Sequence, residues 1–142
     1  MFNIKKRRIE KAIKECISVV GPEIDSYLKP NQAARQAIMN DAYFVGYMEG
    51  WTRELLAKHG LKGCHEQASA LIGVCRNLSK ESQRQMSKRL LSFYTDENNI
   101  DFQGGRRDGT DRVIGVSTGR QEEVTYLLIN HLQSFANKQK EI

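Results

Sequence analysis

The sequence of 142 residues is poor in proline, with only Pro22 and Pro30, both in its first quarter. Proline is the strongest helix breaker, so the rest of the chain lacks the residue that most often interrupts a helix. Cysteine is also scarce. Cys16, Cys64 and Cys75 are odd in number and have no CxxC spacing, which argues against a disulfide framework and predicts free thiols in a reducing cytoplasm.

Long apolar runs are absent as well. No segment approaches the roughly 20 apolar residues that a transmembrane helix needs, and no apolar stretch follows the basic N-terminal residues, as it would in a secretory signal. Neither the P-loop motif nor the dinucleotide-binding fingerprint occurs. We therefore predict no cofactor and one domain over residues 1–142, whose 27% charged and 39% hydrophobic residues are typical of a globular protein.

Metal-ligand residue types are present but poorly spaced. Four of them fall within eight residues: His59, Cys64, His65 and Glu66. They lack the C-x2-4-C and H-x3-5-H spacings of zinc sites, and neighbours on a helix point about 100° apart. Cys16 and Cys75 fall on apolar stripes, where a buried thiol is unreactive. We predict no metal site and no catalytic residue, which favours a non-enzymatic protein.

Apolar residues recur at helical spacing through most of the chain. The pattern predicts an amphipathic helix over about residues 3–20 that stops at Gly21-Pro22, a long helix over 31–58, a third that starts near Gly63, and a last over about 119–138. Ser79 is a good helix cap. The sequence therefore leaves open whether residues 64–94 form one helix or two.

The segment 95–117 has a different character. Glycines at 104, 105, 109 and 115 interrupt a helix by local preference, and β-branched residues at 113, 114 and 116 favour strands. We therefore expect a small β-hairpin around residues 99–117. The predicted fold is a mostly all-α, irregular or orthogonal bundle of four to five helices.

The 31–58 helix is apolar on more than one side, which is typical of a central helix. Gly46 and Gly50 lie four residues apart in it and cost about 1 kcal/mol each relative to alanine, which close approach of another helix would compensate. Its aromatic residues exceed what one side can bury. The candidate partner interface, through which we predict a homodimer, is Tyr43, Phe44, Gly46, Tyr47, Gly50 and Trp51.

The net charge is +5, and the cations are clustered. Steps of four residues advance only 40° around a helix, so a continuous helix would align the cations of residues 76–88 on one face. Each cluster also fits an ordinary solvated helix face or turn. The candidate anion- or nucleic-acid-binding residues are Lys5, Lys6, Arg7, Arg8, Arg76, Lys80, Arg84, Lys88, Arg106 and Arg107.

Three hypotheses about function follow. The leading one is a cytoplasmic, non-enzymatic binding or regulatory protein that acts through protein–protein contacts, as a homodimer or with another protein. The alternative is nucleic-acid binding through the basic helix faces and the arginine loop. The third is a small hydrolase or transferase that combines the arginine loop with His65 or Glu66.

Overall fold

The computed structural model describes residues 2–28, 32–79, 83–96 and 98–140, and these form seven α-helices without a strand. The predicted all-α class is confirmed, but the number of helices is higher than the four to five predicted. The helices are α1 (Phe2–Leu28), α2 (Gln32–Ala37), α3 (Ala42–Lys58), α4 (Cys64–Ser79), α5 (Gln83–Thr95), α6 (Ile100–Thr118) and α7 (Gln121–Lys140), and a short 3-10 turn, η1 (Ile38–Asn40), joins α2 to α3.

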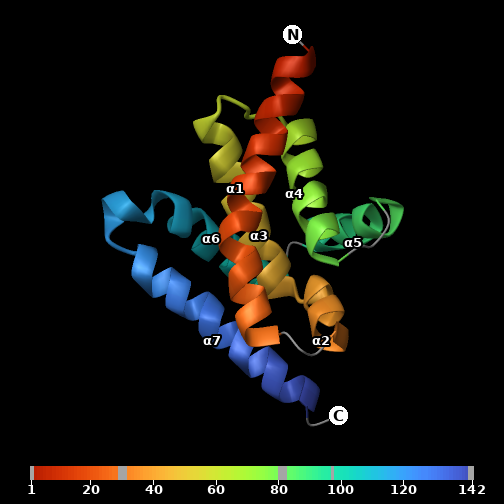
Figure 1. The fold of residues 1–142 in the computed structure, drawn as a ribbon, viewed down its shortest axis with the longest axis vertical. Coiled ribbons are helices and arrows are strands. Elements are labelled where there is room, and N and C mark those ends of the chain that lie inside the picture. Colours follow the sequence, from red (N-terminus) through yellow and green to blue (C-terminus); the bar gives the residue numbers. More distant parts are fainter. Residues whose placement is uncertain (1, 29–31, 80–82, 97, 141–142) are drawn as a thin grey trace.

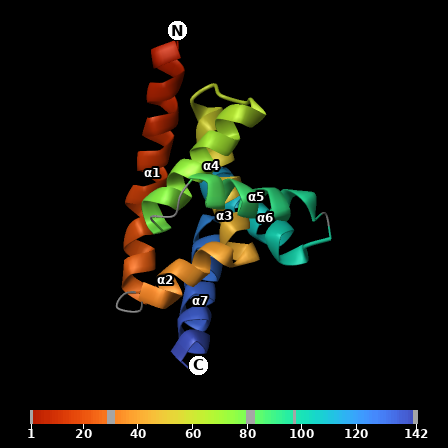
Figure 2. The ribbon, with the colours of Figure 1, turned by 90° about the vertical axis from the view of Figure 1, so that its right-hand side faces the viewer.

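Helix α1 runs along most of the long axis of the molecule (Figure 1). Helix α4 lies beside its N-terminal half and α7 beside its C-terminal half, and α3 runs through the middle in the direction opposite to α1. In the turned view, α5 and the start of α6 project away from α1 (Figure 2). None of the described helices is long and apolar enough to cross a membrane.

The most extensive helix–helix contact joins α3 to α6, and glycines make it possible. A Cβ atom added to Gly46 would overlap the carbonyl oxygen of Phe102, and Gly109 faces the backbone of Tyr47 in the same way. Gly50 and Gly105 complete the contact, so two glycines one turn apart on each helix let the two backbones touch. The close approach expected at Gly46 and Gly50 is confirmed, and the approaching helix is α6 of the same chain.

The β-hairpin predicted around residues 99–117 is wrong, because this segment is helix α6. Asn99 caps its start by accepting a hydrogen bond from the Phe102 backbone N–H at 3.1 Å. The glycines at 105 and 109 lower the local helix preference by about 1 kcal/mol each, but the packing that they allow against α3 outweighs that cost. Tertiary contact therefore decides the conformation against local preference.

Helix α1 does not stop at Gly21-Pro22 but continues to Leu28. Its buried residues recur at every fourth position on both sides of the proline: Ala12, Cys16, Val20, Ile24 and Leu28. A proline inside a helix costs about 3 kcal/mol. Burial of Ile24 and Leu28 returns roughly 1.5–3 kcal/mol each, which is enough to offset it.

The single helix predicted over 31–58 is interrupted near its middle. Asp41 has an extended backbone, with φ −80° and ψ 120°, and its carboxylate accepts a hydrogen bond from the Phe44 backbone N–H at 2.9 Å. This is the geometry of an N-cap, so α3 begins only at Ala42. The segment 64–94, which the sequence left open, forms two helices, α4 and α5.

The α3–α6 contact predicts opposite effects for two neighbouring glycines. We expect Gly105→Ala to lower the free energy of unfolding by about 3 kcal/mol or more, because its Cβ would lie 2.8 Å from the Tyr47 backbone nitrogen. Gly104→Ala should be neutral or raise it by up to about 1 kcal/mol, since nothing lies within 4 Å of the added Cβ. Urea unfolding followed by circular dichroism measures both, and equal effects would contradict this packing.

Candidate functional site

A groove of about 830 Å³ opens between α1 and α7, with α3 and α6 at its base. Apolar and aromatic side chains alternate with amides and a few charges around it. The rim is partly exposed: Val19 on α1 is 41% exposed and Tyr126 on α7 is 67% exposed. The lining residues are Val19, Tyr27, Trp51, Leu55, Lys58, Arg112, Val113, Gln121, Glu122, Thr125, Tyr126, Ile129, Asn130 and Gln133.

At the base of the groove, the guanidinium of Arg112 is held over the indole ring of Trp51. The Arg112 guanidinium lies 4.5 Å from the centre of the Trp51 ring, within the range of a cation–π contact. Its two terminal nitrogens donate to the two carboxylate oxygens of Glu23, one at 3.0 Å, and Nη1 also reaches the Tyr47 hydroxyl at 3.4 Å. A buried arginine held in this fork has little freedom to move.

The surroundings of Arg112 and Tyr47 shift the pKa values of both side chains. Burial opposes the charged form of Arg112, but the hydrogen bonds that it donates to Glu23 and Tyr47, with the charges of these groups, outweigh burial and raise the pKa of Arg112. Burial also raises the pKa of Tyr47 above its ordinary value. The Tyr47 hydroxyl donates to the Val124 carbonyl on α7 at 2.9 Å. The base of the groove thus ties α1, α3, α6 and α7 together as a charged but internally neutralised unit.

A second polar cluster fixes α7 against α3. His131 Nε2 lies 2.6 Å from the carboxylate of Asp41, the residue that caps α3. The Tyr43 ring packs on the His131 ring at 4.6 Å between centroids. The Tyr43 hydroxyl donates to Asp108 on α6 at 2.8 Å. These contacts join the start of α3 to the middle of α6 and of α7, and none of the four residues lines the groove.

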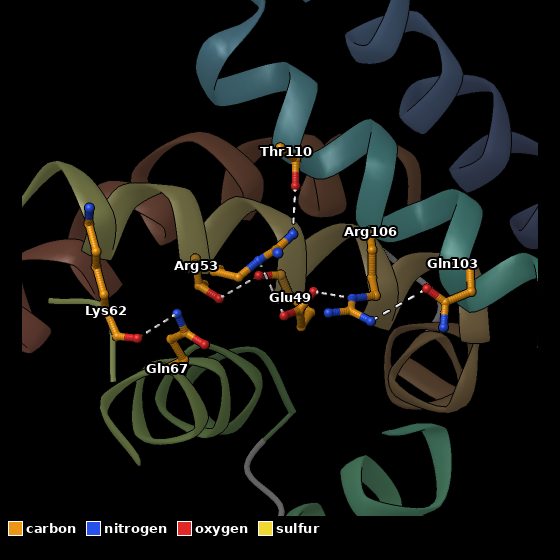
Figure 3. A network of polar contacts seen from close by, with 8 residues as sticks. Glu49, Arg53, Lys62, Gln67, Gln103, Arg106 and Thr110 are labelled. Atoms are coloured by element: carbon orange, nitrogen blue, oxygen red, sulfur yellow. Dashed lines mark hydrogen bonds and ion pairs between the residues drawn. The ribbon is translucent and has the colours of Figure 1, made fainter. Parts of the chain in front are cut away.

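The third polar cluster lies on the other side of α3 (Figure 3). Glu49 is only 3% exposed, and its carboxylate accepts from Arg106 Nε at 2.7 Å and faces Arg53 Nε at 3.5 Å. Arg53 also donates to the Thr110 hydroxyl at 2.9 Å. The carboxylate therefore accepts a charge-assisted hydrogen bond from Arg106 of α6 and forms an ion pair with Arg53 of its own helix, and the bond to Arg106 stabilises the α3–α6 contact.

The predicted interface residues of the 31–58 segment lie inside the chain. Phe44 and Tyr47 are fully buried and Trp51 is 5% exposed, while Gly46 and Gly50 face α6 and Tyr43 contacts α6 and α7. In one chain this surface is therefore covered by α6 and α7. Of the six predicted interface residues, only Trp51 lines the groove, so a contact with a partner there would mainly use other residues.

The predicted anion-binding residues do not form one surface. Lys5, Lys6, Arg7 and Arg8 lie exposed on α1. The cations of residues 76–88 are divided between two helices. Arg76 lies in the last turn of α4, Arg84 and Lys88 lie on α5, and Lys80 is outside the described residues. Arg106 is bound to Glu49, and Arg107, in α6 rather than a loop, faces Asp108 at 3.5 Å. Only the α1 group stays together.

The ligand-type residues around 59–66 are also separated. His59 pairs with Glu15 at 3.4 Å, Glu66 faces Lys5 at 3.8 Å, and Cys64 and His65 are exposed. Within the described part of the chain, no three His, Cys, Asp or Glu side chains come together as metal ligands. Cys16 and Cys75 are buried.

Sequence reasoning missed Arg112, Glu23 and Glu49. Glu23 and Arg112 lie outside the predicted helices, so their burial could not be seen. Glu49 lies in the predicted 31–58 helix, but its partner Arg106 was expected in a loop. One signal was present: Phe102, Gly105, Gly109 and Arg112 share a helical face, at steps of three and four residues. Reading 99–117 as a helix would have placed Arg112 on the buried side.

Comparison with known proteins gives no relative. No protein-family model matches the sequence, and no significant match was found among curated proteins or solved structures. The function therefore has to be inferred from the residues of this chain.

The buried carboxylate of Glu49 can be tested by an isosteric change. Glu49→Gln removes the charge that faces Arg53 and Arg106, both still about one-third exposed, so we expect a loss of about 2–3 kcal/mol in the free energy of unfolding. Glu54→Gln, on a less buried turn of the same helix, should cost under about 0.5 kcal/mol. Equal losses in urea unfolding would show that Glu49 has no special role.

Three tyrosines, of which Tyr47 is fully buried, Tyr43 is partly buried and Tyr94 is 40% exposed, predict a loss of stability at high pH. Burial raises the pKa values of Tyr43, Tyr47 and Tyr94 above the ordinary 10.0. The unfolded chain releases these protons first, so stability is complete below about pH 10 and falls as the pH rises beyond it. Melting temperatures across this range should decline, and tyrosinate absorbance of these three residues should appear together with unfolding. Their ionisation near pH 10 with the helices intact would contradict the prediction.

Proposed function

We propose that this protein is a non-enzymatic binding protein whose groove between α1 and α7 receives a helical segment of another protein. The observation that supports this proposal is the composition of the groove. Trp51, Tyr126, Tyr27 and Arg112 all line it, and Trp, Tyr and Arg are the residue types that contribute most binding energy at protein interfaces. Arg112 and Trp51 are 8% and 5% exposed and would form a fixed floor beneath the partner, which costs no conformational freedom on binding, while the exposed Tyr126 on the rim would make a larger contact.

The dimensions of the groove suit a helix. Its α7 wall extends from Gln121 to Gln133, which at 1.5 Å per residue is about 18 Å, or some three helical turns. Within the described residues every element is helical, so no sheet edge is offered for strand addition. An amphipathic partner helix would set apolar residues against Val19 and Ile129 and polar residues against the amides of the rim.

The chemistry of the lining favours binding over catalysis. Among the described residues that form the groove there is one carboxylate, Glu122, and neither histidine nor cysteine. General acid–base hydrolysis uses a pair of titratable groups set around the reacting bond. The two basic side chains, Lys58 and Arg112, differ in availability, because Arg112 is already paired with Glu23.

The test uses a photoreactive phenylalanine analogue in place of Tyr126, expressed in the native cell. We expect one discrete crosslinked protein, whose crosslinked peptide maps to an amphipathic helix. Val19→Glu, across the groove, should abolish the product. Leu91→Glu, an apolar residue of α5 that is 63% exposed and outside the groove, should leave it unchanged.

A synthetic peptide of the crosslinked segment then provides a direct measurement. Trp51 is the only tryptophan of the chain and lies at the base of the groove, so peptide binding should change its fluorescence in the wild type and not in Val19→Glu. Crosslinking to a second copy of the chain would replace the proposed partner with a homodimer. Products that form equally in Val19→Glu would refute the groove as the binding site.

A further inference from the structure

One end of the molecule holds all of its net positive charge. The first turns of α1 project beyond the rest of the chain (Figures 1 and 2), and the loop after α3 lies against them. Residues 4–15 and 58–66, named here the basic end, contain eight Lys and Arg and three Glu. Its net charge of +5 equals that of the whole chain, so the remainder is neutral overall.

The fold joins these two segments. Arg8 Nη1 donates to the His59 carbonyl at 3.3 Å, which holds the loop against α1. Gly60 allows the loop to turn there, with a φ of +78°. The end of α3 and this loop therefore add two exposed cations, Lys58 and Lys62, to those of α1. Sequence patterns could not predict this contact, because the two segments are about fifty residues apart.

Two of the three carboxylates of the basic end are engaged, and the third, Glu10, is exposed on α1 beside three exposed cations. Glu66 faces Lys5 at 3.8 Å and Glu15 faces His59 at 3.4 Å. Arg7, Lys11 and Lys14 are exposed and spaced four and three residues apart, so they form one row on the outer side of α1. The row is about 10 Å long at 1.5 Å per residue, long enough to contact successive phosphates of one strand.

We propose that the basic end binds the phosphate backbone of double-stranded nucleic acid, independently of base sequence. A membrane surface is less suited, because an interfacial helix must bury an apolar face, and on α1 that face packs into the core through Ala12, Cys16 and Val20. Single strands are disfavoured as well. They bind through aromatic stacking, and residues 4–15 and 58–66 contain no Phe, Tyr or Trp.

The experiment compares two triple variants with the same net charge. Arg7→Gln, Lys11→Gln and Lys14→Gln together neutralise the row on α1. Arg76→Gln, Arg84→Gln and Lys88→Gln neutralise three exposed cations on α4 and α5. Fluorescence anisotropy measures the binding of each variant to labelled duplex DNA and duplex RNA of about 20 base pairs, at salt concentrations between about 50 and 200 mM. Helix content and melting temperature confirm that both variants are folded.

We expect the wild type to bind duplexes with an affinity that falls as salt rises, since each neutralised phosphate releases counterions. The α1 variant should bind at least about tenfold more weakly and lose about three from the slope of log affinity against log salt. The α4–α5 variant should change affinity by less than about twofold. DNA and RNA duplexes share a phosphate backbone, so comparing their affinities shows which of the two nucleic acids the basic end binds more tightly.

Four results would overturn the proposal. The first is no binding of the wild type to either duplex at low salt. The second is equal weakening in both triple variants, which would mean that only net charge matters. The third is tighter binding to a single strand than to the duplex. The fourth is binding to vesicles of anionic phosphatidylserine without binding to nucleic acid, which would assign the basic end to a membrane surface.

Discussion

The contact between the backbones of α3 and α6 is the constraint on which the rest of the structure depends. Four glycines remove every Cβ atom from the contact, at positions 46, 50, 105 and 109. The helices can then approach closely enough for side chains beside the contact to reach across it. Glu49 meets Arg106 on one side of α3, and Tyr47 meets Arg112 on the other. Neither pair could form if alanine held the helices farther apart.

The buried charges also favour one register of the two helices. A shift of one turn would keep one glycine of each helix in the contact but replace the other with a residue that has a side chain, so close packing already disfavours it. A one-turn shift would separate Glu49 from Arg106 and leave this carboxylate, which is 3% exposed, without the hydrogen bond from α6 and facing only Arg53 of its own helix. Breaking a buried pair in this way costs roughly 3–5 kcal/mol. Close packing and the ion pair therefore favour the same alignment of the two helices.

The parts of the fold that sequence reasoning predicted are those where local pattern and burial agree. The stripe of α7 is buried at Val124, Leu128 and Leu132, and the pair Gly46 and Gly50 correctly indicated a closely packed helix. Helix α6 was missed because its glycines have the low helix preference of a turn, and only the identity of the facing helix reveals their role. The groove needs residues from four helices, and no single segment carries its pattern.

The two proposed binding surfaces meet at one residue, which relates them energetically. Lys58, at the end of α3, lines the groove and also belongs to the basic end. A partner helix that placed a carboxylate near Lys58 would lower the positive potential of the basic end, because charges within about 8 Å are little screened at physiological salt. An apolar or basic partner segment would leave that potential unchanged or raise it. Linkage is reciprocal, so a nucleic acid on the basic end would change the affinity of the groove by the same factor. The charge of the partner helix beside Lys58 thus decides whether the two surfaces compete, act independently or reinforce each other.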